Sequence, residues 1–311
     1  MSYPKMKLLA IIRLIPRSLL KVRPPLCSHY KIRYMTRKPW RVKGKKNKRR
    51  LRQVNVPGMC ISVDQLESRN SGYIGVLRGF MTKQRYTCAT VFVDHYSDLT
   101  FTYLQKSLTV EDTVKAKKAF ETFSRRFGVR IHHYYSDNGR FADKDFIKAV
   151  NDANQTNSFC RSYTHFQNGK VEMKIRDLQD KAKTTLLHSV SRWAKASSTH
   201  LWPYALAYVT DLRNHLTLNS NTESPMQDFS QSFVNPQLST FHTFGYLVYS
   251  LDTRLQRGVL SQMGTRCSIG LYLGNSPRHG RTVSLILNLT TGKISPQSHV
   301  KYDEFFESIN T

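Results

Sequence analysis

The order of apolar and polar positions predicts alternating strands and helices over the first two thirds of the chain. Strands are expected where apolar residues alternate, or where β-branched and aromatic residues gather, at 59–66, 72–80, 86–93, 99–104, 129–135 and 156–160. Helices are expected from the N-cap Thr109 to Phe127, and over residues 143–150. This succession of antiparallel strands followed by alternating helices and strands predicts a mixed α/β sheet.

The longest helical pattern covers residues 169–193, where apolar positions recur every three or four residues. A polar stripe with Glu172, Arg176 and Gln179 lies beside the apolar one. An ordinary amphipathic surface helix would show the same pattern, so the pattern alone leaves the role of Glu172 open. Residues 202–216 are apolar on nearly every side and predict a buried helix. The polar, proline-bearing residues 220–236 are expected to form a linker.

The pattern changes again after Phe241, where short strands alternate with Gly, Asn, Ser and Pro. Strands are expected at 247–251, 268–273, 283–289, 294–296 and 299–306. So many short strands in so few residues predict a small β-barrel.

Charge adds a partner class to this picture. The chain of 311 residues has 48 Lys and Arg against 21 Asp and Glu, for a net charge of +27. Residues 1–56 hold 18 of the basic residues, and no acid precedes Asp64. Such a run repels itself and is expected to be disordered until it meets phosphate. The arm is therefore interpreted as a DNA-binding or nuclear-localisation tail, with a solvated tail without a partner as the alternative.

Cysteine usage and hydropathy bear on the compartment. The five cysteines are widely spaced and form no C-x-x-C pair, which predicts a reducing compartment without disulfides. The longest apolar runs fall short of the roughly 18–20 residues of a membrane span. We therefore expect a nuclear or cytoplasmic protein without a membrane partner. Residues 8–12, among basic residues, superficially suggest a targeting peptide; a non-native leader is the alternative.

Three acids stand at positions suited to metal chemistry. Asp64 ends the alternation of residues 60–63, Asp137 follows a predicted strand, and Glu172 opens the long helix. Carboxylates are the ligands that Mg²⁺ and Mn²⁺ prefer. Two such ions roughly 3.5–4 Å apart can activate a nucleophile and stabilise a leaving oxygen in phosphodiester chemistry. In a chain with 21 acids, the spacing of this trio is weak evidence by itself.

The segments around the acids resemble the integrase of copia-type long-terminal-repeat retrotransposons. Similarity covers the chain from about Cys27 to its end. The matching segments are 63–68 (VDQLES), 91–97 (VFVDHYS), 136–142 (SDNGRFA), 165–169 (HFQNG), 175–176 (IR), 201–205 (LWPYA), 224–226 (SPM), 244–245 (FG), 270–274 (GLYLG) and 295–300 (SPQSHV).

This resemblance implies a fold, an activity and a site. It implies an α/β fold with an RNase H-like five-stranded sheet at 57–230 and an SH3-like β domain at 231–311, after the basic arm at 1–56. Asp64, Asp137 and Glu172 would bind two Mg²⁺ or Mn²⁺ ions, trim a DNA 3′ end and join it to target DNA. The partners would be element ends and target DNA, with a homo-oligomer allowed. The expected DNA contacts are Asn138, Gln167, Asn168, Lys174, Arg176, Lys45, Lys46, Lys48, Arg49 and Arg50.

Several departures from the family leave a second function open. Tyr30 stands where the fourth ligand of the upstream zinc module would fall, and the histidine half is missing, so no zinc is expected. Met173 replaces a residue that is usually basic, Arg161-Ser162 replaces Gly and an apolar residue, and 261–264 replaces a Trp-bearing segment. The chain is therefore expected to be a fragment. It would act either as a polynucleotidyl transferase or as a catalytically inactive nucleic-acid-binding remnant; a structural relic without a partner is a third alternative, disfavoured by the charge.

Two further acids and a histidine pair are interpreted structurally. Asp94 and Asp98 flank a predicted hairpin and are expected to be turn residues rather than metal ligands. His132 and His133 are adjacent on a predicted strand, so they point to opposite faces and cannot share one metal ion.

Overall fold

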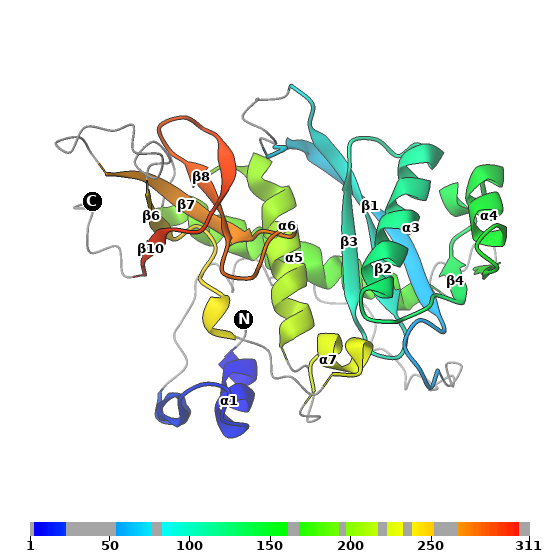
Figure 1. Ribbon diagram of the computed structural model, residues 1–311, viewed down its shortest axis with the longest axis horizontal. Coiled ribbons are helices and arrows are strands. Elements are labelled where there is room, and N and C mark those ends of the chain that lie inside the picture. Colours follow the sequence, from blue (N-terminus) through cyan, green and yellow to red (C-terminus); the bar gives the residue numbers. More distant parts are fainter. Residues whose placement is uncertain are drawn as a thin grey trace, which may run out of the picture.

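A computed structural model describes residues 3–22, 54–75, 83–160, 168–192, 197–216, 223–232, 238–251 and 266–304. This part of the chain contains two five-stranded sheets, with long helices between them (Figure 1). A short helix, α1 (Tyr3–Ile11), and a 3₁₀ turn, η1 (Arg17–Lys21), precede them. The basic run of the arm lies outside the described residues.

The larger sheet is mixed and has the order β3-β2-β1-β4-β5. Its strands are β1 (Ile61–Gly72), β2 (Tyr86–Asp94), β3 (Thr100–Gln105), β4 (His133–Ser136) and β5 (Thr156–Phe159). The first three pair antiparallel, whereas β4 runs parallel to β1 and β5 runs parallel to β4. With helices on both faces, this sheet confirms the predicted RNase H-like α/β fold class.

Strand β1 is longer than the sequence predicts. It continues to Gly72, which pairs with Tyr86 of β2, instead of ending near residue 66. The glycine at position 72 marks a close approach rather than a turn, because a Cβ there would lie 2.3 Å from Cγ of Pro203. The separate strand expected at 72–80 is therefore wrong in its first residues; residues 76–80 lie outside the described part.

One face of the larger sheet is covered by α3 (Val110–Arg125) and α4 (Lys144–Asn151). The predicted N-cap of α3 is confirmed, since the Thr109 side chain accepts a hydrogen bond from the Asp112 N–H at 3.4 Å. The core on this face is aromatic, and the rings of Phe92 and Phe120 stack with centroids 4.7 Å apart. Such buried ring pairs contribute about 0.5–1.5 kcal/mol beyond their buried area. After β4, a 3₁₀ turn, η2 (Arg140–Ala142), leads into α4.

The other face is covered by α5 (Gly169–Arg192) and α6 (Trp202–His215), with η4 (Thr199–Leu201) leading into α6. Both helices agree with the apolar patterns of the sequence. Their buried residues, among them Leu178 and Val209, pack against Leu66 and Val91 of the sheet. This face is the one toward which Asp64 points, since it shares the alternation of Leu66 along β1.

The linker predicted at 220–236 is wrong in its described part, residues 223–232. Residues Pro225–Ser230 form a helix, α7. The Ser224 side chain accepts from the Gln227 N–H, and the Gln227 side chain binds the Ser224 backbone in return, which is a capping box. Phe229 of α7 is fully buried in the aromatic core.

The second sheet follows a 3₁₀ turn, η5 (Leu238–Thr240), and has the order β10-β6-β7-β8-β9. Its strands are β6 (Leu247–Leu251), β7 (Cys267–Asn275), β8 (Ser284–Asn288), β9 (Ile294–Gln297) and β10 (Val300–Asp303). Strands β9 and β10 lie at opposite edges, although only residues 298–299 connect them. A connection this short requires the sheet to curl, and the Tyr302 and Ser284 hydroxyls meet at 2.5 Å across the curl. The sheet is consistent with the predicted SH3-like barrel.

The two sheets share one apolar core. Leu271 and Leu273 of β7 belong to the same buried cluster as Leu206 and Val209 of α6, and α6 stands between the sheets (Figure 1). The two sheets thus lie on either side of the predicted domain boundary at residue 231, and their buried side chains pack together.

Cysteines and hydropathy add two observations. The four described cysteines, at positions 60, 88, 160 and 267, form no disulfide. Across the described ranges, none of the helices combines the length and the apolar character needed to cross a membrane.

Candidate active site

Two of the predicted acids lie beside each other on neighbouring parallel strands. Ile61 and Ser62 of β1 pair with Tyr134 and Tyr135 of β4. Continued by two residues, this register brings Asp64 level with Asp137, the residue directly after β4. Neighbouring strands are about 4.8 Å apart, so the two carboxylates stand side by side at the end of β4.

The start of α5 is attached to the same place on β1. The Asn168 amide donates a hydrogen bond to the Val63 carbonyl at 3.2 Å, and Asn168 is only 2% exposed. Residues four apart lie on one face of a helix, so Glu172 follows Asn168 one turn along α5. Glu172 is therefore carried past Asp64 on the side of the sheet to which Asp64 points.

Cys160 feels the charge of all three acids. Burial raises the pKa of the Cys160 thiol above its ordinary value, and the charges of Asp137, Glu172 and Asp64 raise it further. All three carboxylates thus lie within electrostatic reach of one side chain. No pattern in the sequence relates Cys160 to these acids.

The carboxylates do not yet form a closed ligand set. Within the described ranges, no three His, Cys, Asp or Glu side chains are close enough to hold one metal ion. Asp64 Oδ1 accepts the Gln65 N–H at 2.7 Å, and Asp137 Oδ1 accepts the Gly139 N–H at 3.3 Å. All three acids are partly exposed. Their donor chemistry fits a hard divalent cation.

A network of ion pairs holds the other side of α5. Lys174, 6% exposed, binds Asp98 in the turn between β2 and β3, and Lys170 lies 3.6 Å from the same carboxylate. Arg213 of α6 contacts Asp98 at 3.4 Å and also binds Asp177. The network fixes α5 to the hairpin and to α6 at once.

Burial and charge oppose each other in this network. Burial and the nearby Arg213 lower the pKa of Lys174 to about 8. Burial would raise the pKa of Asp98, but Lys174, Lys170 and Arg213 outweigh it and hold that pKa below its ordinary value. Asp98 is thus a turn residue, at φ +64°, and also the anion that three cations share.

The predicted DNA contacts separate into three groups. Asn138 and Arg176 are exposed near the acids. Lys174 and Asn168 are buried and bind protein groups, which speaks against direct DNA contact by either one. The remaining predicted contacts lie outside the described residues: Gln167, Lys45, Lys46, Lys48, Arg49 and Arg50.

Two residues near the acids had no predicted role. Lys170 donates to the His95 carbonyl at 2.9 Å, and His95 Nε2 lies 2.7 Å from the Ser62 hydroxyl. Burial, with Lys170 nearby, lowers the pKa of His95 to about 4, so this imidazole is neutral at physiological pH. These contacts join residues from β1, the β2–β3 turn and α5, which no local sequence pattern could have related.

Asp94 and the histidine pair behave as predicted. Asp94 is fully buried and accepts hydrogen bonds from the Ser97 N–H, the Ser97 hydroxyl and the Gly58 N–H, which confirms a turn role. His133 contacts the hydroxyls of Thr156 and Ser158, whereas His132 is exposed.

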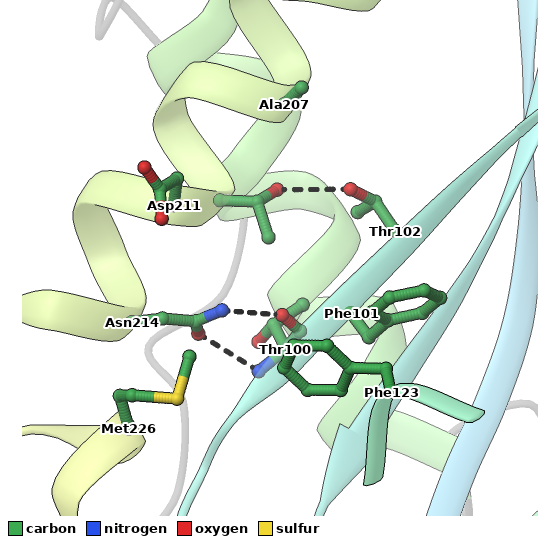
Figure 2. Close-up of a pocket in the computed structure, with 9 residues that line it drawn as sticks. Thr100, Phe101, Thr102, Phe123, Ala207, Asp211, Asn214 and Met226 are labelled. Atoms are coloured by element: carbon green, nitrogen blue, oxygen red, sulfur yellow. Dashed lines mark hydrogen bonds between the residues drawn. The ribbon is translucent and has the colours of Figure 1, made fainter. Parts of the chain in front are cut away.

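A cavity of about 170 Å³ lies away from the acids, beside edge strand β3. Figure 2 shows that Asn214 of α6 spans the backbone of Thr100, donating to its carbonyl at 2.7 Å and accepting from its N–H at 3.0 Å. The Thr102 hydroxyl donates a hydrogen bond to the Thr210 hydroxyl at 3.4 Å. The polar groups of the cavity thus satisfy one another, and we interpret the cavity as a packing gap between β3, α3, α6 and α7.

Asn168 offers a test of how α5 is positioned. Asn168→Ala removes the donor to the buried Val63 carbonyl, which should cost about 1–3 kcal/mol of unfolding free energy. It should also weaken Mn²⁺ binding, because Glu172 is no longer held beside Asp64. The measurements are denaturant unfolding and Mn²⁺ titration. Asn151→Ala, at an exposed position of α4, is the control; equal values for both variants would exclude a positioning role.

Comparisons with known proteins give distant structural likenesses alone. No family model matches the chain, and no curated protein matches its sequence. A simian T-cell lymphotropic virus intasome, solved in complex with the PP2A regulatory subunit B56 gamma, is 17% identical over 84% of each chain, with a TM-score of 0.46. The HTLV-2 integrase catalytic core domain in complex with magnesium is 18% identical over 56% of this chain and 97% of that one, with a TM-score of 0.39.

The catalytic core domain of BIV integrase is 15% identical over 56% of this chain and 95% of that one, with a TM-score of 0.39. At such values the likeness concerns the chain path alone. The roles of individual residues are argued from the contacts described above.

Proposed function

We propose that this protein is a metal-dependent polynucleotidyl transferase that trims DNA 3′ ends and joins them to target DNA. One observation carries the proposal: Asp64, Asp137 and Glu172 come from two neighbouring strands and the helix packed over them, and all three act on the Cys160 thiol. An RNase H-like sheet supports it. Carboxylates gathered in this way repel one another, and their oxygen donors suit a hard divalent cation.

In this proposal, the reaction at the site is an in-line displacement at phosphorus. When bound, two Mg²⁺ or Mn²⁺ ions supply a deprotonated nucleophile and stabilise the leaving oxygen. The chain itself contributes Asp64, Asp137 and Glu172 as oxygen ligands. Water would serve as nucleophile for trimming, and the freed 3′-hydroxyl for joining.

Charge supports DNA as the substrate. The chain carries a net charge of +27, and Arg176 and Asn138 are exposed close to the acids. In this proposal the basic arm holds phosphate, and the protein acts where DNA is, in the nucleus or the cytoplasm, alone or as a homo-oligomer. The segments shared with copia-type integrases support such an element as its source.

A second function is favoured by one observation. Met173, next to Glu172, is 70% exposed where the family pattern has a basic residue, which removes a phosphate contact beside the acids. A chain that binds nucleic acid without cleaving it would show the same fold and the same charge.

Activity on oligonucleotides separates the two functions. With a labelled duplex and Mg²⁺ or Mn²⁺, the wild type is expected to release trimmed strands and to form joined products. Asp64→Asn should abolish both, because it removes a metal ligand from β1. Asp145→Asn, at an exposed position of α4, is the matched control and should act as wild type. Absence of products from every protein, with DNA binding retained, would favour the inactive binding remnant.

A further inference from the structure

A second basic surface lies at the far end of β1 and β2, and we call it the ribbon tip. It brings together residues from the end of β1, the start of β2, the end of β3 and the turn between β7 and β8. Its cations are Arg69, Lys83, Arg85, Lys106 and Arg278, of which all but Arg85 are exposed. The described segments that form the tip are residues 67–75, 83–87, 106 and 276–280. Within them, Glu67 is the acidic residue that stands against the five basic ones.

Contacts among the β1, β2 and β3 segments show that they meet. Gly72 pairs with Tyr86. The Arg85 guanidinium lies over the Tyr73 ring, 5.1 Å from its centroid. Lys106 of the β3 end binds the Gln84 side chain. The cations of the three strands therefore belong to one surface.

The tip is attached to the start of α6 rather than projecting freely. Trp202 Nε1 donates to the Asn70 carbonyl at 2.9 Å, and the Tyr73 N–H donates to the His200 carbonyl at 2.8 Å. The Tyr73 and His200 rings lie with centroids 5.5 Å apart. These contacts hold the basic side chains on a rigid base, which lowers the entropy lost when a ligand binds.

The second sheet adds to the same surface. Arg278, in the β7–β8 turn, is exposed. Burial raises the pKa of the Tyr86 hydroxyl, and the charge of Arg278 opposes part of that rise, so Arg278 lies within electrostatic reach of Tyr86. The tip is therefore formed by both sheets, which share one core through α6.

The chemistry of the tip fits an extended polyanion better than a single small anion. Five cations spread over four segments match the repeated charges of a phosphate backbone. Arginine stacked on an aromatic ring, with other rings nearby, is typical of nucleic-acid surfaces. Asp64 pairs with Val91 and Gly72 pairs with Tyr86, so the tip lies five residues of β2 from the acids, roughly 17 Å at about 3.3 Å per residue.

We propose that the ribbon tip binds the phosphate backbone of nucleic acid at a distance from the reacting end. A duplex whose end lies at the three acids would reach the tip about five base pairs away, at about 3.4 Å per base pair. The placement of the end rests on the proposed function; the binding surface itself does not.

The test uses two matched triple variants of the full chain. The tip variant is Arg69→Ala, Lys83→Ala and Arg278→Ala. The control variant is Lys118→Ala, Arg126→Ala and Arg130→Ala, which removes the same charge from exposed positions in and after α3. Binding of a labelled 16-base-pair duplex is followed by fluorescence anisotropy in EDTA, from 50 to 200 mM salt, so that catalysis plays no part.

The tip variant should bind more weakly and with a shallower salt dependence. Each lost phosphate contact reduces the magnitude of the negative slope of log K against log salt by about 0.9, so the loss of three contacts reduces it by about 2.7. The control variant should keep the wild-type slope. Equal slopes for both variants would overturn the proposal, whether or not the wild type joins DNA. A shallower slope for the tip variant alone supports it, even if no protein joins DNA.

Two further arms examine the kind of partner and the geometry. If the tip variant lost binding to phosphatidylserine vesicles and kept its affinity for DNA, the surface would be a membrane contact and the proposal would be overturned. A hairpin of three base pairs, about 10 Å long at about 3.4 Å per base pair, is too short to reach the tip from the acids. In joining assays the tip variant should therefore be impaired on the long duplex and equal to wild type on the hairpin; equal impairment on both would contradict the placement.

Discussion

Glu172→Gln is expected to reduce the rate of DNA-end joining by about a thousandfold without changing the fold. The substitution removes one charged metal ligand and keeps the shape of the side chain. A loss of about 4 kcal/mol of transition-state stabilisation corresponds to this factor. Glu172 is partly exposed in the first turns of α5, so the melting temperature should stay within a degree or two of the wild-type value. Single-turnover joining rates and thermal unfolding are the two measurements.

Glu111→Gln is the matched control for this change. Glu111 is exposed in the first turn of α3, as Glu172 lies in the first turn of α5. The control removes the same charge at an equivalent helix position away from the acids. If both variants joined DNA at the wild-type rate, Glu172 would be a residue of an ordinary amphipathic helix, the alternative that its pattern left open.

Asp98→Asn is expected to destabilise the protein by about 2–3 kcal/mol. Three cations, Lys174, Lys170 and Arg213, gather on this carboxylate, and Lys174 is buried. Removing one partner of a buried pair costs about 3–5 kcal/mol, and the one-third exposure of Asp98 reduces that value. Asparagine tolerates the left-handed backbone at φ +64°, so the change isolates charge from backbone strain. Urea unfolding measures the effect.

The double variant Asp98→Asn/Lys174→Met should recover part of the loss, because it removes the buried cation that the first change leaves unpaired. Asp152→Asn, an exposed aspartate after α4, should leave the stability within about 0.5 kcal/mol of wild type. A double variant less stable than Asp98→Asn alone would show that Lys174 contributes packing rather than charge. In that case the network would not be the electrostatic clamp of α5 described above.

Much of the fold follows from local pattern. The stripe of α5, the run of β-branched and aromatic residues in β2 and the cap at Thr109 each involve residues within a few positions of one another, so the sequence contains the whole signal. Helix α7 was missed although Ser224, Pro225 and Gln227 form a standard helix start, because their polarity was given more weight than their spacing.

The site could be predicted only in part. Asp64 and Asp137 were placed at strand positions. The residues around each acid do not indicate that β1 and β4 are neighbouring strands. Their grouping with Glu172 came from resemblance to a family. The burial of Lys174 was missed because its partner Asp98 lies 76 residues away, and sequence spacing carries no information about such a pair.

The apolar core that the two sheets share has a consequence for how the molecule comes apart. Leu271 and Leu273 of the second sheet are buried against Leu206 and Val209 of α6, and α6 covers the larger sheet as well. Unfolding of the C-terminal strands would expose the apolar side of α6 to water. Heating should therefore melt both sheets in one cooperative transition, with a heat-capacity change that reflects all the described core. The smallest unit able to fold by itself is then larger than the sheet that carries the acids.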